Sequence, residues 1–403
     1  MLTVEDARER VLAAIEVGPD IEVELEAALG LVTSADVMAP HALPRFDNSA
    51  MDGYAVRAQD VIEASDASPV NLRLIDESRA GSPATSKVEP GEAIRIMTGA
   101  EVPEGADSIV IVENTSEQDE TVIVRAPGGE YIRPAGEDVE AGGVAVPVGT
   151  ELDPGGLALL AACGVAKVRV HRRPRIALLV TGDELTTADV ELAPGQIRDS
   201  NSIALRTLTL TTGADVSFYA RVSDDLDDAL NLYQKASEEA DLVVSSGGVA
   251  VGRYDVVREV IEKLGRIDLW RVAMQPGKPV VLGWINDVPF LGLPGNPVSV
   301  HVSFEQFVRP AIRKMLGCRR LLRPRLPARL TKEVRKVSGR LHFVRVRLNW
   351  KNGVLEATPT GPQGSHIQSS LIACDGVALF PADAEHLLAG SEVTVEVWGL
   401  PDR

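Results

Sequence analysis

The pattern of apolar and polar positions between residues 172 and 320 alternates between two periodicities. Short apolar runs, such as 175–180 (RIALLV) and 241–246 (DLVVSS), are typical of buried strands. The segments that follow these runs have the apolar spacing of amphipathic helices. This alternation predicts an α/β domain with a parallel or mixed sheet, whose crossover connections are right-handed.

The regions on either side of this domain have a different pattern. Between residues 70 and 150, and again after residue 320, short apolar runs lie between Gly- and Pro-containing turns, which predicts two small β domains. Residues 3–16 have the spacing of an amphipathic helix, and residues 20–38 are interpreted as a second helical stretch. With 403 residues the chain is too long for one ordinary core, so we predict a multidomain protein of mixed α/β and β class.

Composition narrows the classes of function. A net charge of −17 and an aromatic content of 4% argue against nucleic-acid binding, which favours basic surfaces and aromatic stacking. No apolar run is long enough to cross a bilayer, and three widely spaced cysteines fit a reducing cytoplasm. The charge is uneven, because residues 309–351 hold 15 Lys and Arg against one acid. That stretch is interpreted either as a solvated basic face or as an electrostatic guide for an anionic substrate or partner.

Three loops in the α/β region follow predicted strands: 181–185 (TGDEL), 245–255 (SSGGVAVGRYD) and 293–299 (LPGNPVS). In one sheet these loops face the same edge, where ligands of α/β proteins bind. Their glycines allow close approach of the backbone, and amides at a helix start suit an anion. Each loop alone is typical of a structural turn, but the three together predict a phosphate-type ligand site. The predicted ligand-binding residues are Thr181, Gly182, Asp183, Ser246, Gly247, Gly248, Gly252, Pro294, Gly295, Asn296 and Pro297.

Acidic residues at the same edge predict a cation. Asp183, Glu184 and Asp255 would repel a phosphate unless a cation lies between them, and Mg²⁺ held by one or two carboxylates is the usual solution. Lys278, in the stretch PGKP, is a candidate partner for phosphate charge. The alternative interpretation of Lys278 is a surface lysine after a turn.

Three further stretches are polar and have no regular periodicity: 45–57 (RFDNSAMDGYAVR), 95–100 (RIMTGA) and 135–138 (AGED). They are interpreted either as ordered linkers and strand ends, or as loops of one domain that contact a substrate bound in another domain. Their candidate polar residues are Asp47, Asn48, Ser49, Asp52, Thr98, Glu137 and Asp138.

Taken together, these stretches resemble the MoeA family of molybdopterin molybdenumtransferases, which is related to the E domain of gephyrin. The matching stretches lie in order between residues 46 and 370: FDNSAMDGYAVR, RIMTGAEVPEGAD, AGED, TGDEL, DSN, SSGGV, PGKP, GLPGNPVS and GSHIQSS. The resemblance covers essentially the whole chain and implies an elongated, L-shaped, four-domain subunit that forms a homodimer. The implied domains are a dimerising domain I (1–45 with 133–171), a small β domain II (46–132), an α/β molybdopterin-binding domain III (172–320) and a C-terminal β domain IV (321–403).

The resemblance also implies an activity, the Mg²⁺-dependent insertion of molybdate into adenylated molybdopterin with release of AMP. The active cleft would lie between the α/β domain of one subunit and loops of the other. Glu184 and Asp255 would hold Mg²⁺ or a water, and glycine amides would position the phosphates. By motif position the catalytic residues are Asp52, Thr98, Asp138, Glu184, Asp255 and Lys278.

The chain departs from the family pattern at three places. Ala250 stands where many members have serine, Gln275 where many have lysine, and Pro134 with Ala135 where many have further basic residues. Loss of one charge-assisted contact costs about 1.5–3 kcal/mol, so these changes would weaken molybdate capture unless another basic residue compensates. The candidates for compensation are Arg253, Arg271 and Arg345.

The departures leave a second function open. A gephyrin-like scaffold would keep the fold and reduce or lose catalysis. It would bind the tail of a membrane receptor or a tubulin-like cytoskeletal peptide, with the basic 309–351 stretch as the surface for an acidic partner.

Overall fold

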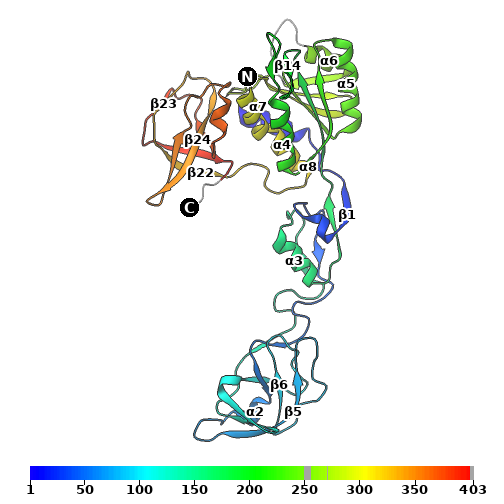
Figure 1. The fold of residues 1–403 in the computed structure, drawn as a ribbon, viewed down its shortest axis with the longest axis vertical. Helices are drawn as coiled ribbons and strands as arrows, with labels where there is room; N and C mark the ends of the chain where they lie inside the picture. The colour runs from blue at the N-terminus through cyan, green and yellow to red at the C-terminus, as the bar shows by residue number, and fades with distance from the viewer. Residues whose placement is uncertain (249–255, 270, 400–403) are drawn as a thin grey trace.

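The computed structural model describes residues 1–248, 256–269 and 271–399, which form an elongated molecule (Figure 1). An upper body holds an α/β domain on one side and a C-terminal β domain on the other. A narrow neck connects the upper body to a lower β domain at the far end of the molecule. The fold is therefore multidomain and of mixed α/β and β class, as the sequence predicted.

A six-stranded mixed sheet forms the centre of the α/β domain. The strand order is β16-β13-β17-β21-β20-β18, in which the first three pairings are parallel and the two pairings of β20 are antiparallel. Every residue of β17 is buried, because helices cover both faces of the sheet. The strands are β13 (Arg175–Thr181), β16 (Asp215–Val222), β17 (Leu242–Ser246), β18 (Gly265–Leu269), β20 (Val281–Ile285) and β21 (Val288–Leu293).

Two sets of helices cover this sheet. α5 and α6 pack on one face of the sheet, and α4, α7 and α8 pack on the other. α1 also packs on this second face, although the chain leaves it directly for the neck. Asp225 caps α5 by accepting a hydrogen bond from the amide of Asp228 at 2.9 Å. The helices are α1 (Val4–Ala13), α4 (Asn201–Thr212), α5 (Leu226–Glu239), α6 (Val256–Leu264), α7 (Pro297–Ser303) and α8 (Arg309–Met315). Among the described residues, no helix combines the length and apolar character that crossing a membrane requires.

A π-helical turn, Phe304–Val308, lies between α7 and α8 in one continuous helical segment. This turn buries two polar side chains at the junction between domains. Gln306 donates to Glu396 Oε1 at 2.6 Å and its carbonyl oxygen accepts from Arg8 Nε at 3.2 Å. Glu305 pairs with Arg323 at 2.9 Å. The turn thereby joins α1, the α/β domain and the C-terminal β domain into one upper body.

The C-terminal β domain is a small closed barrel. Its order is β19-β24-β25-β22-β28-β26, and β24 also pairs with β26, which closes five of the strands into a ring. β19 comes from the α/β domain and adds to the outside of β24. The strands are β19 (Met274–Gln275), β22 (Arg325–Leu330), β23 (Val334–Arg335), β24 (Leu341–Lys351), β25 (Val354–Pro359), β26 (Gly376–Phe380), β27 (His386–Leu387) and β28 (Glu392–Val397).

The neck contains two short antiparallel strand pairs, β1–β12 and β2–β11, with α3 packed beside them. The expectation of a helix over 20–38 is wrong. Its first residues, DIEVE, alternate apolar and polar positions and pair with β12, a strand from far along the chain, so tertiary pairing overrides the helical tendency of LEAALG. The elements are β1 (Asp20–Glu24), β2 (Val37–Met38), β11 (Val144–Val146), β12 (Lys167–His171), α3 (Pro154–Ala162) and a 3₁₀ turn, Leu25–Ala28.

The lower domain contains the short strands predicted between residues 70 and 150. Five of them join β4, which precedes this region, in a sheet in the order β7-β4-β6-β5-β9-β8, with a core around Tyr54, Leu72 and Val122. A two-residue pair, β3 with β10, connects this sheet to the neck. The elements are β3 (Asn48–Ser49), β4 (Gly53–Val56), α2 (Ala58–Val61), β5 (Val70–Ser78), β6 (Glu92–Ile96), β7 (Ser108–Ile111), β8 (Thr115–Gln118), β9 (Thr121–Val124) and β10 (Ile132–Arg133).

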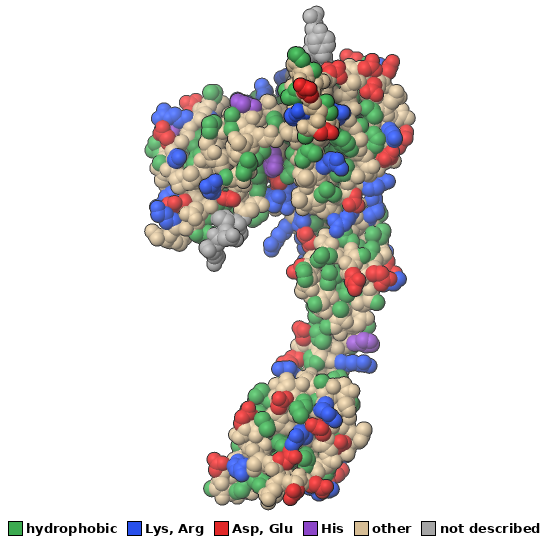
Figure 2. Space-filling view, viewed as in Figure 1, with side chains coloured by type: hydrophobic (Ala, Val, Ile, Leu, Met, Phe, Trp, Pro, Cys, Tyr) green, Lys and Arg blue, Asp and Glu red, His purple; other side chains and the backbone are tan. Residues whose placement is uncertain are grey.

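Many of the basic residues of the 309–351 stretch are engaged in contacts within the molecule. Arg309 and Arg323 pair with Glu305, and Arg313 pairs with Glu151 of the neck. Figure 2 shows Lys and Arg side chains gathered beneath the upper body, where it meets the neck. For these arginines neither a solvated face nor a guide for partners is the correct interpretation, because they are paired within the molecule, and Arg313 joins α8 to the neck.

Candidate active site

The carboxyl ends of β13, β17 and β21 lie side by side, because these strands are parallel neighbours. The loops that follow them surround a cavity of about 760 Å³, which is within the usual size range of ligand pockets. Thr181, Gly247 and Pro294 line the cavity, one from each loop. The edge at which the sequence predicts a ligand therefore contains a hollow of ligand size.

Two glycines let the second loop turn closely against the first. Gly247 and Gly248 have φ angles of 87° and 64°, in the left-handed region that other residues rarely adopt. A Cβ atom on Gly247 would lie 2.5 Å from the carbonyl oxygen of Thr181, and one on Gly248 would overlap Val257. Only bare backbone fits here, so main-chain amides rather than side chains form this wall of the cavity.

Asn201, the first residue of α4, fastens the second and third loops to each other. Its Nδ2 donates to Ser246 Oγ at 3.0 Å and to the carbonyl oxygen of Gly295 at 2.6 Å. Ser246 Oγ donates in turn to the carbonyl oxygen of Pro294 at 3.2 Å. Within the described part of the chain, the buried atoms Asn201 Oδ1 and Thr181 Oγ1 have no hydrogen-bond partner. Unpaired buried polar atoms beside a cavity are suited to a polar ligand.

Carboxylates gather at one side of the cavity. Glu184 and Asp224 line it, and Asp183 accepts a hydrogen bond from the amide of Asp224 at 3.3 Å. Partial burial, followed by repulsion from Asp183 and Glu184, raises the pKa of Asp224 above its ordinary value. A cation would relieve this repulsion, so Glu184 and Asp224 fit Mg²⁺. The described residues include no group of three or more His, Cys, Asp or Glu side chains placed to hold a metal, so substrate oxygens and waters would complete its coordination.

The third loop contributes Pro294, Gly295, Asn296 and Pro297 to the cavity wall. Asn296 occupies the N-cap position of α7, but its side chain makes no capping hydrogen bond. The amide of Val298 donates to the carbonyl oxygen of Ser365 at 3.1 Å, so this amide of the helix start is not free for an anion. The loop therefore presents its backbone and the Asn296 side chain rather than a full set of helix amides.

A segment of the C-terminal β domain completes the cavity. His366 and Gln368 line it, although they lie in a different domain from the three loops. The buried guanidinium of Arg345 holds this segment, donating to the carbonyl oxygens of Pro362 and Gly364, each at 3.2 Å. The C-terminal domain is thus part of the site as well as a neighbour of it.

The basic residues weighed in the sequence differ in their placement. Lys278 is exposed and directly precedes the lining residue Pro279, a position that suits a contact with an anion in the cavity. Gln275 lies in β19 opposite His342 of β24. Arg271 is exposed, and Arg253 lies outside the described residues.

Asp52 and Thr98 form a pair in the lower domain. Thr98 donates to Asp52 Oδ1 through its backbone amide at 2.7 Å and through its hydroxyl at 2.8 Å. These two hydrogen bonds hold the pKa of the exposed Asp52 carboxyl below its ordinary value. Asp52 is therefore a carboxylate that remains charged over the physiological range.

Within one chain, the predicted catalytic residues do not all come together. The Asp52–Thr98 pair is on the lower domain, far from the α/β sheet (Figure 1). Asp138 is exposed between the lower domain and the neck, where its amide donates to the carbonyl oxygen of Leu43 at 2.9 Å. Asp255 and Gly252 lie outside the described residues, as does Ala250.

Several polar residues that line the site were absent from the set predicted from the sequence, among them Asn201, Asp224, His366 and Gln368. Asn201 is in the stretch DSN, and the last two are in GSHIQSS, so the matching stretches contained a signal for three of them. Asp224 follows β16 with no motif of its own, and only the sheet order places it beside Glu184.

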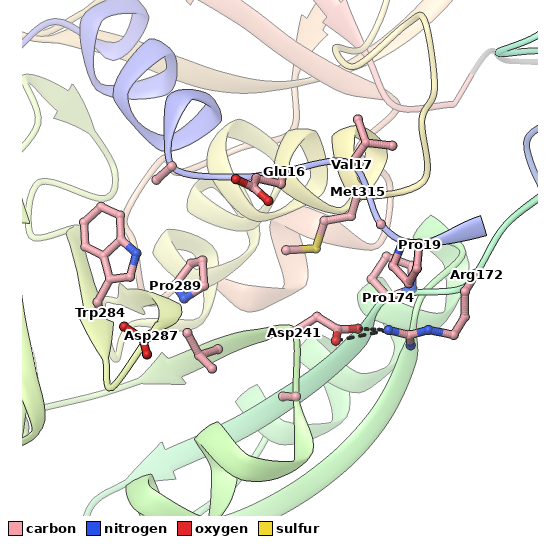
Figure 3. A pocket seen from close by; sticks show the side chains of 14 residues that line it. Glu16, Val17, Pro19, Arg172, Pro174, Asp241, Trp284, Asp287, Pro289 and Met315 are labelled. Atoms are coloured by element: carbon pink, nitrogen blue, oxygen red, sulfur yellow. Dashed lines mark hydrogen bonds and ion pairs between the residues drawn. The ribbon is translucent and has the colours of Figure 1, made fainter. Parts of the chain in front are cut away.

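A second cavity, of about 480 Å³, lies at the opposite edge of the same sheet, where the strands begin (Figure 3). Trp284, Pro289 and Met315 form much of its wall, and Arg172 points toward the neighbouring Asp241 at one side of it. Asp241 pairs with both Arg172 and Arg175, so its charge is balanced within the protein. This cavity contains none of the predicted site residues.

Comparison with known protein families first defines a class. Residues 177–314 match a probable molybdopterin-binding domain, which places the loops described above in a protein class organised around that domain. Residues 2–164 match the MoeA N-terminal region, comprising domains I and II, and residues 327–398 match the MoeA C-terminal region, domain IV. The chain belongs to the MoeA family of molybdopterin molybdenumtransferases.

Individual relatives are similar over their whole length. Molybdopterin molybdenumtransferase 2 of Mycobacterium tuberculosis is 38% identical over 408 residues, covering 99% of this chain and 100% of the relative. The molybdopterin molybdenumtransferase of Haemophilus influenzae is 35% identical over 403 residues, covering 98% of each. The crystal structure of a molybdopterin biosynthesis MoeA protein from Pyrococcus horikoshii superposes with a TM-score of 0.85 at 35% identity, covering 98% of this chain and 99% of the other.

Proposed function

We propose that this chain catalyses the Mg²⁺-dependent insertion of molybdate into adenylated molybdopterin, with release of AMP. The observation that carries the proposal is the 760 Å³ cavity at the carboxyl edge of the sheet, which has glycine backbone on one wall, unpaired polar atoms on another and carboxylates at its side. A pterin that bears phosphate groups needs this combination. The family of the chain, whose curated relatives are molybdopterin molybdenumtransferases, supports the same chemistry.

Substrate phosphates would lie along the backbone of Gly247 and Gly248. Thr181 Oγ1 and Asn201 Oδ1, which lack partners among the described residues, would contact the polar groups of the substrate. Lys278 would offset phosphate charge from its exposed position beside Pro279. These contacts fix the ligand before any bond changes, which is a large part of catalysis at phosphorus centres.

Glu184 and Asp224 would hold Mg²⁺, and Asp255 is a further ligand that the resemblance implies. When bound, the ion supplies positive charge to the phosphoanhydride as negative charge develops there. The carboxylates of Glu184 and Asp224 would orient the substrate-bound cation. Arg345 is fully buried and does not line the cavity, so it would act through the His366 segment that it holds rather than by contact with molybdate.

We also propose that the active unit is a homodimer. Asp52 and Thr98 are separated from the cavity by the length of the neck, so only a second copy can bring such a pair to the cavity (Figure 1). Exposed apolar side chains on α4 support an interface on the α/β domain: Ile203 is 61% exposed and Leu210 is 56% exposed. Burial of these side chains between copies would remove them from water.

The direct test uses the purified chain with adenylated molybdopterin, Mg²⁺ and molybdate, and measures AMP by chromatography. The proposal predicts AMP release that depends on both Mg²⁺ and molybdate. Glu184→Ala should lower the rate by about 100-fold or more, as loss of one electrostatic contact to developing charge does. Glu239→Ala, which removes an exposed carboxylate on α5, is the matched control and should not change the rate. Absence of AMP release by the wild type at millimolar molybdate would refute the proposal.

The scaffold function is not favoured by these findings. Several arginines of the 309–351 stretch are paired inside the molecule, which weakens the case for a basic docking surface. The curated relatives named above are enzymes. The three free cysteines agree with the reducing cytoplasm that we propose as the location of the protein.

A further inference from the structure

The second cavity, at the edge where the strands of the α/β sheet begin, has no role in the function proposed above, and we call it the joint cavity (Figure 3). Its volume of about 480 Å³ is within the usual range of ligand pockets. The chain passes from α1 to the neck through residues 14–19 and returns from β12 to β13 through residues 172–174. Both connections contribute to the lining, so the cavity lies at the joint between the upper body and the neck.

Hydrogen bonds hold the walls of the joint cavity in place. The amide of Gly18 donates to the carbonyl oxygen of Met315 at 2.7 Å, which fixes the outgoing connection to α8. The amide of Arg172 donates to the carbonyl oxygen of Pro19 at 2.9 Å, which fixes the two connections to each other. The cavity is therefore a preformed space, as ligand pockets usually are.

Much of the lining of the joint cavity is apolar. Trp284, Val288 and Pro289 come from the hairpin of β20 and β21, and Met315 comes from α8. Val17 also lines the cavity, and 49% of its surface is exposed. A ligand with an apolar body would cover these side chains, and removing their surface from water would favour its binding.

The charges of the lining are not balanced. Asp241 pairs with Arg172 and with Arg175, at 2.9 Å in each case. Glu16 and Asp287 are exposed and form neither an ion pair nor a side-chain hydrogen bond with any other described residue. The joint cavity therefore presents two carboxylates whose charge the described part of the chain does not neutralise.

These two carboxylates come from different elements of the fold. Glu16 is on the outgoing connection to the neck, and Asp287 is in the turn between β20 and β21. Figure 3 shows them on opposite sides of Pro289. Apolar surface thus separates two negative charges, and this arrangement is complementary to a molecule with a positive charge at each end and an apolar chain between.

We propose that the joint cavity binds an aliphatic diamine. One ammonium group would pair with Glu16 and the other with Asp287, while the methylene chain packs against Pro289 and Met315. A single metal ion fits less well, because it needs oxygen ligands on all sides and the surface between these carboxylates is apolar. The bound diamine would link the neck connection to the sheet and so stiffen the joint. This inference does not depend on the proposed function.

Calorimetric titration of putrescine into the full-length protein tests the proposal. Butylamine has the same carbon chain with one charge, and butanediol has none. Putrescine should bind at one site per chain and about threefold or more tightly than butylamine, because it forms a second ion pair with a partly exposed carboxylate. Butanediol should not bind. Equal affinities for putrescine and butylamine, or no binding of putrescine at millimolar concentration, would overturn the proposal.

Neutral variants test the two carboxylates separately. Glu16→Gln and Asp287→Asn should each lower the affinity for putrescine to about that of the wild type for butylamine. Asp227→Asn is the matched control, because Asp227 is an exposed acid at the start of α5, at the opposite edge of the sheet. If all three variants bind putrescine as the wild type does, the diamine is attracted only by the general negative charge of the protein and the joint cavity is not its site.

The fluorescence of Trp284 locates the ligand. Putrescine should change the tryptophan emission of the wild type, and this change should disappear in Trp284→Phe, which should still bind putrescine in calorimetry. A change that persists in Trp284→Phe, or no change in the wild type, would place the ligand elsewhere.

Two further measurements test the class of ligand and its effect on the joint. Putrescine should slow the amide hydrogen exchange of residues 14–19, whereas exchange that is unchanged at saturation would show that the ligand does not link the neck connection to the sheet. Millimolar Mg²⁺ should leave the affinity for putrescine nearly unchanged after correction for ionic strength. Full competition by Mg²⁺ would show a metal site instead of a diamine site.

Discussion

At the residue scale, the electrostatics of the cavity are dominated by acids that repel one another. Glu184 and Asp224 line the same space, and Asp183 accepts a hydrogen bond from the Asp224 amide. Natural proteins keep such an arrangement when a ligand relieves it, because unpaired like charges lower stability. The repulsion among these acids is therefore a sign of function, and it leads to a measurable prediction about stability.

Replacing Asp224 with Asn should raise the free energy of unfolding at pH 7 by about 0.5 kcal/mol, the size usual for exposed charge interactions. The pKa of Asp224 is raised in the folded state, so its ionisation opposes folding above that pKa. The gain should therefore shrink as the pH falls through the raised pKa toward the unfolded value of about 4. Urea unfolding of both proteins at pH 7 and at about pH 4 measures this effect.

Asp227→Asn is the control for this experiment. Asp227 lies in the first turn of α5, where negative charge is favourable, so its neutralisation should lower stability slightly.

Mg²⁺ should also raise the unfolding temperature of the wild type more than that of Asp224→Asn. Identical stability of Asp224→Asn and the wild type at both pH values would show that the three acids do not oppose one another.

At the element scale, the loops of the α/β domain could be predicted because their signals are local. A buried apolar run followed by glycines identifies a strand end in a few residues, and parallel order then places three such ends at one edge. Asp224 and the His366 segment could not be predicted in this way, because they reach the cavity only through sheet order and the packing of another domain. The error over 20–38 has the same cause, since β12, the partner of β1, is far away in sequence.

The glycine loops give a prediction at this scale. Gly247→Ala should lower both stability and substrate binding, because the new Cβ would lie 2.5 Å from the carbonyl oxygen of Thr181 at a φ of 87°. A cost of roughly 1–3 kcal/mol is expected for a residue forced into this conformation. Unfolding in urea and pterin binding by fluorescence measure the two effects.

Gly295→Ala is the matched control on the third loop. Its Cβ would meet only the Cα of Gly247 at 3.8 Å, an ordinary contact, and its φ is not in the left-handed region. The free energy of unfolding, which is the property compared here because Gly295 lines the cavity, should therefore remain close to that of the wild type. If Gly247→Ala and Gly295→Ala lower the free energy of unfolding equally, close backbone packing does not shape the glycine wall of the cavity.

At the scale of the whole molecule, the most important feature is the distance that separates the cavity of the α/β domain from the lower domain. Each end has groups suited to one part of a shared active site: the upper cavity has glycine loops and acids, and the lower domain has the Asp52–Thr98 pair. One chain contains both sets but keeps them apart at opposite ends of the molecule (Figure 1). The family resemblance, rather than the pattern of the sequence, predicted the elongated shape, because no local signal reports the length of a neck.

The central claim is that one active site is assembled from two copies of the chain, and mixed dimers test it most directly. Glu184→Ala and Asp52→Ala chains would be co-expressed with different affinity tags, and dimers carrying both tags would be purified and assayed for AMP release. Each parent homodimer should be nearly inactive, whereas the mixed dimer has one intact site and should show about half the wild-type activity. A mixed dimer as inactive as its parents would contradict the account.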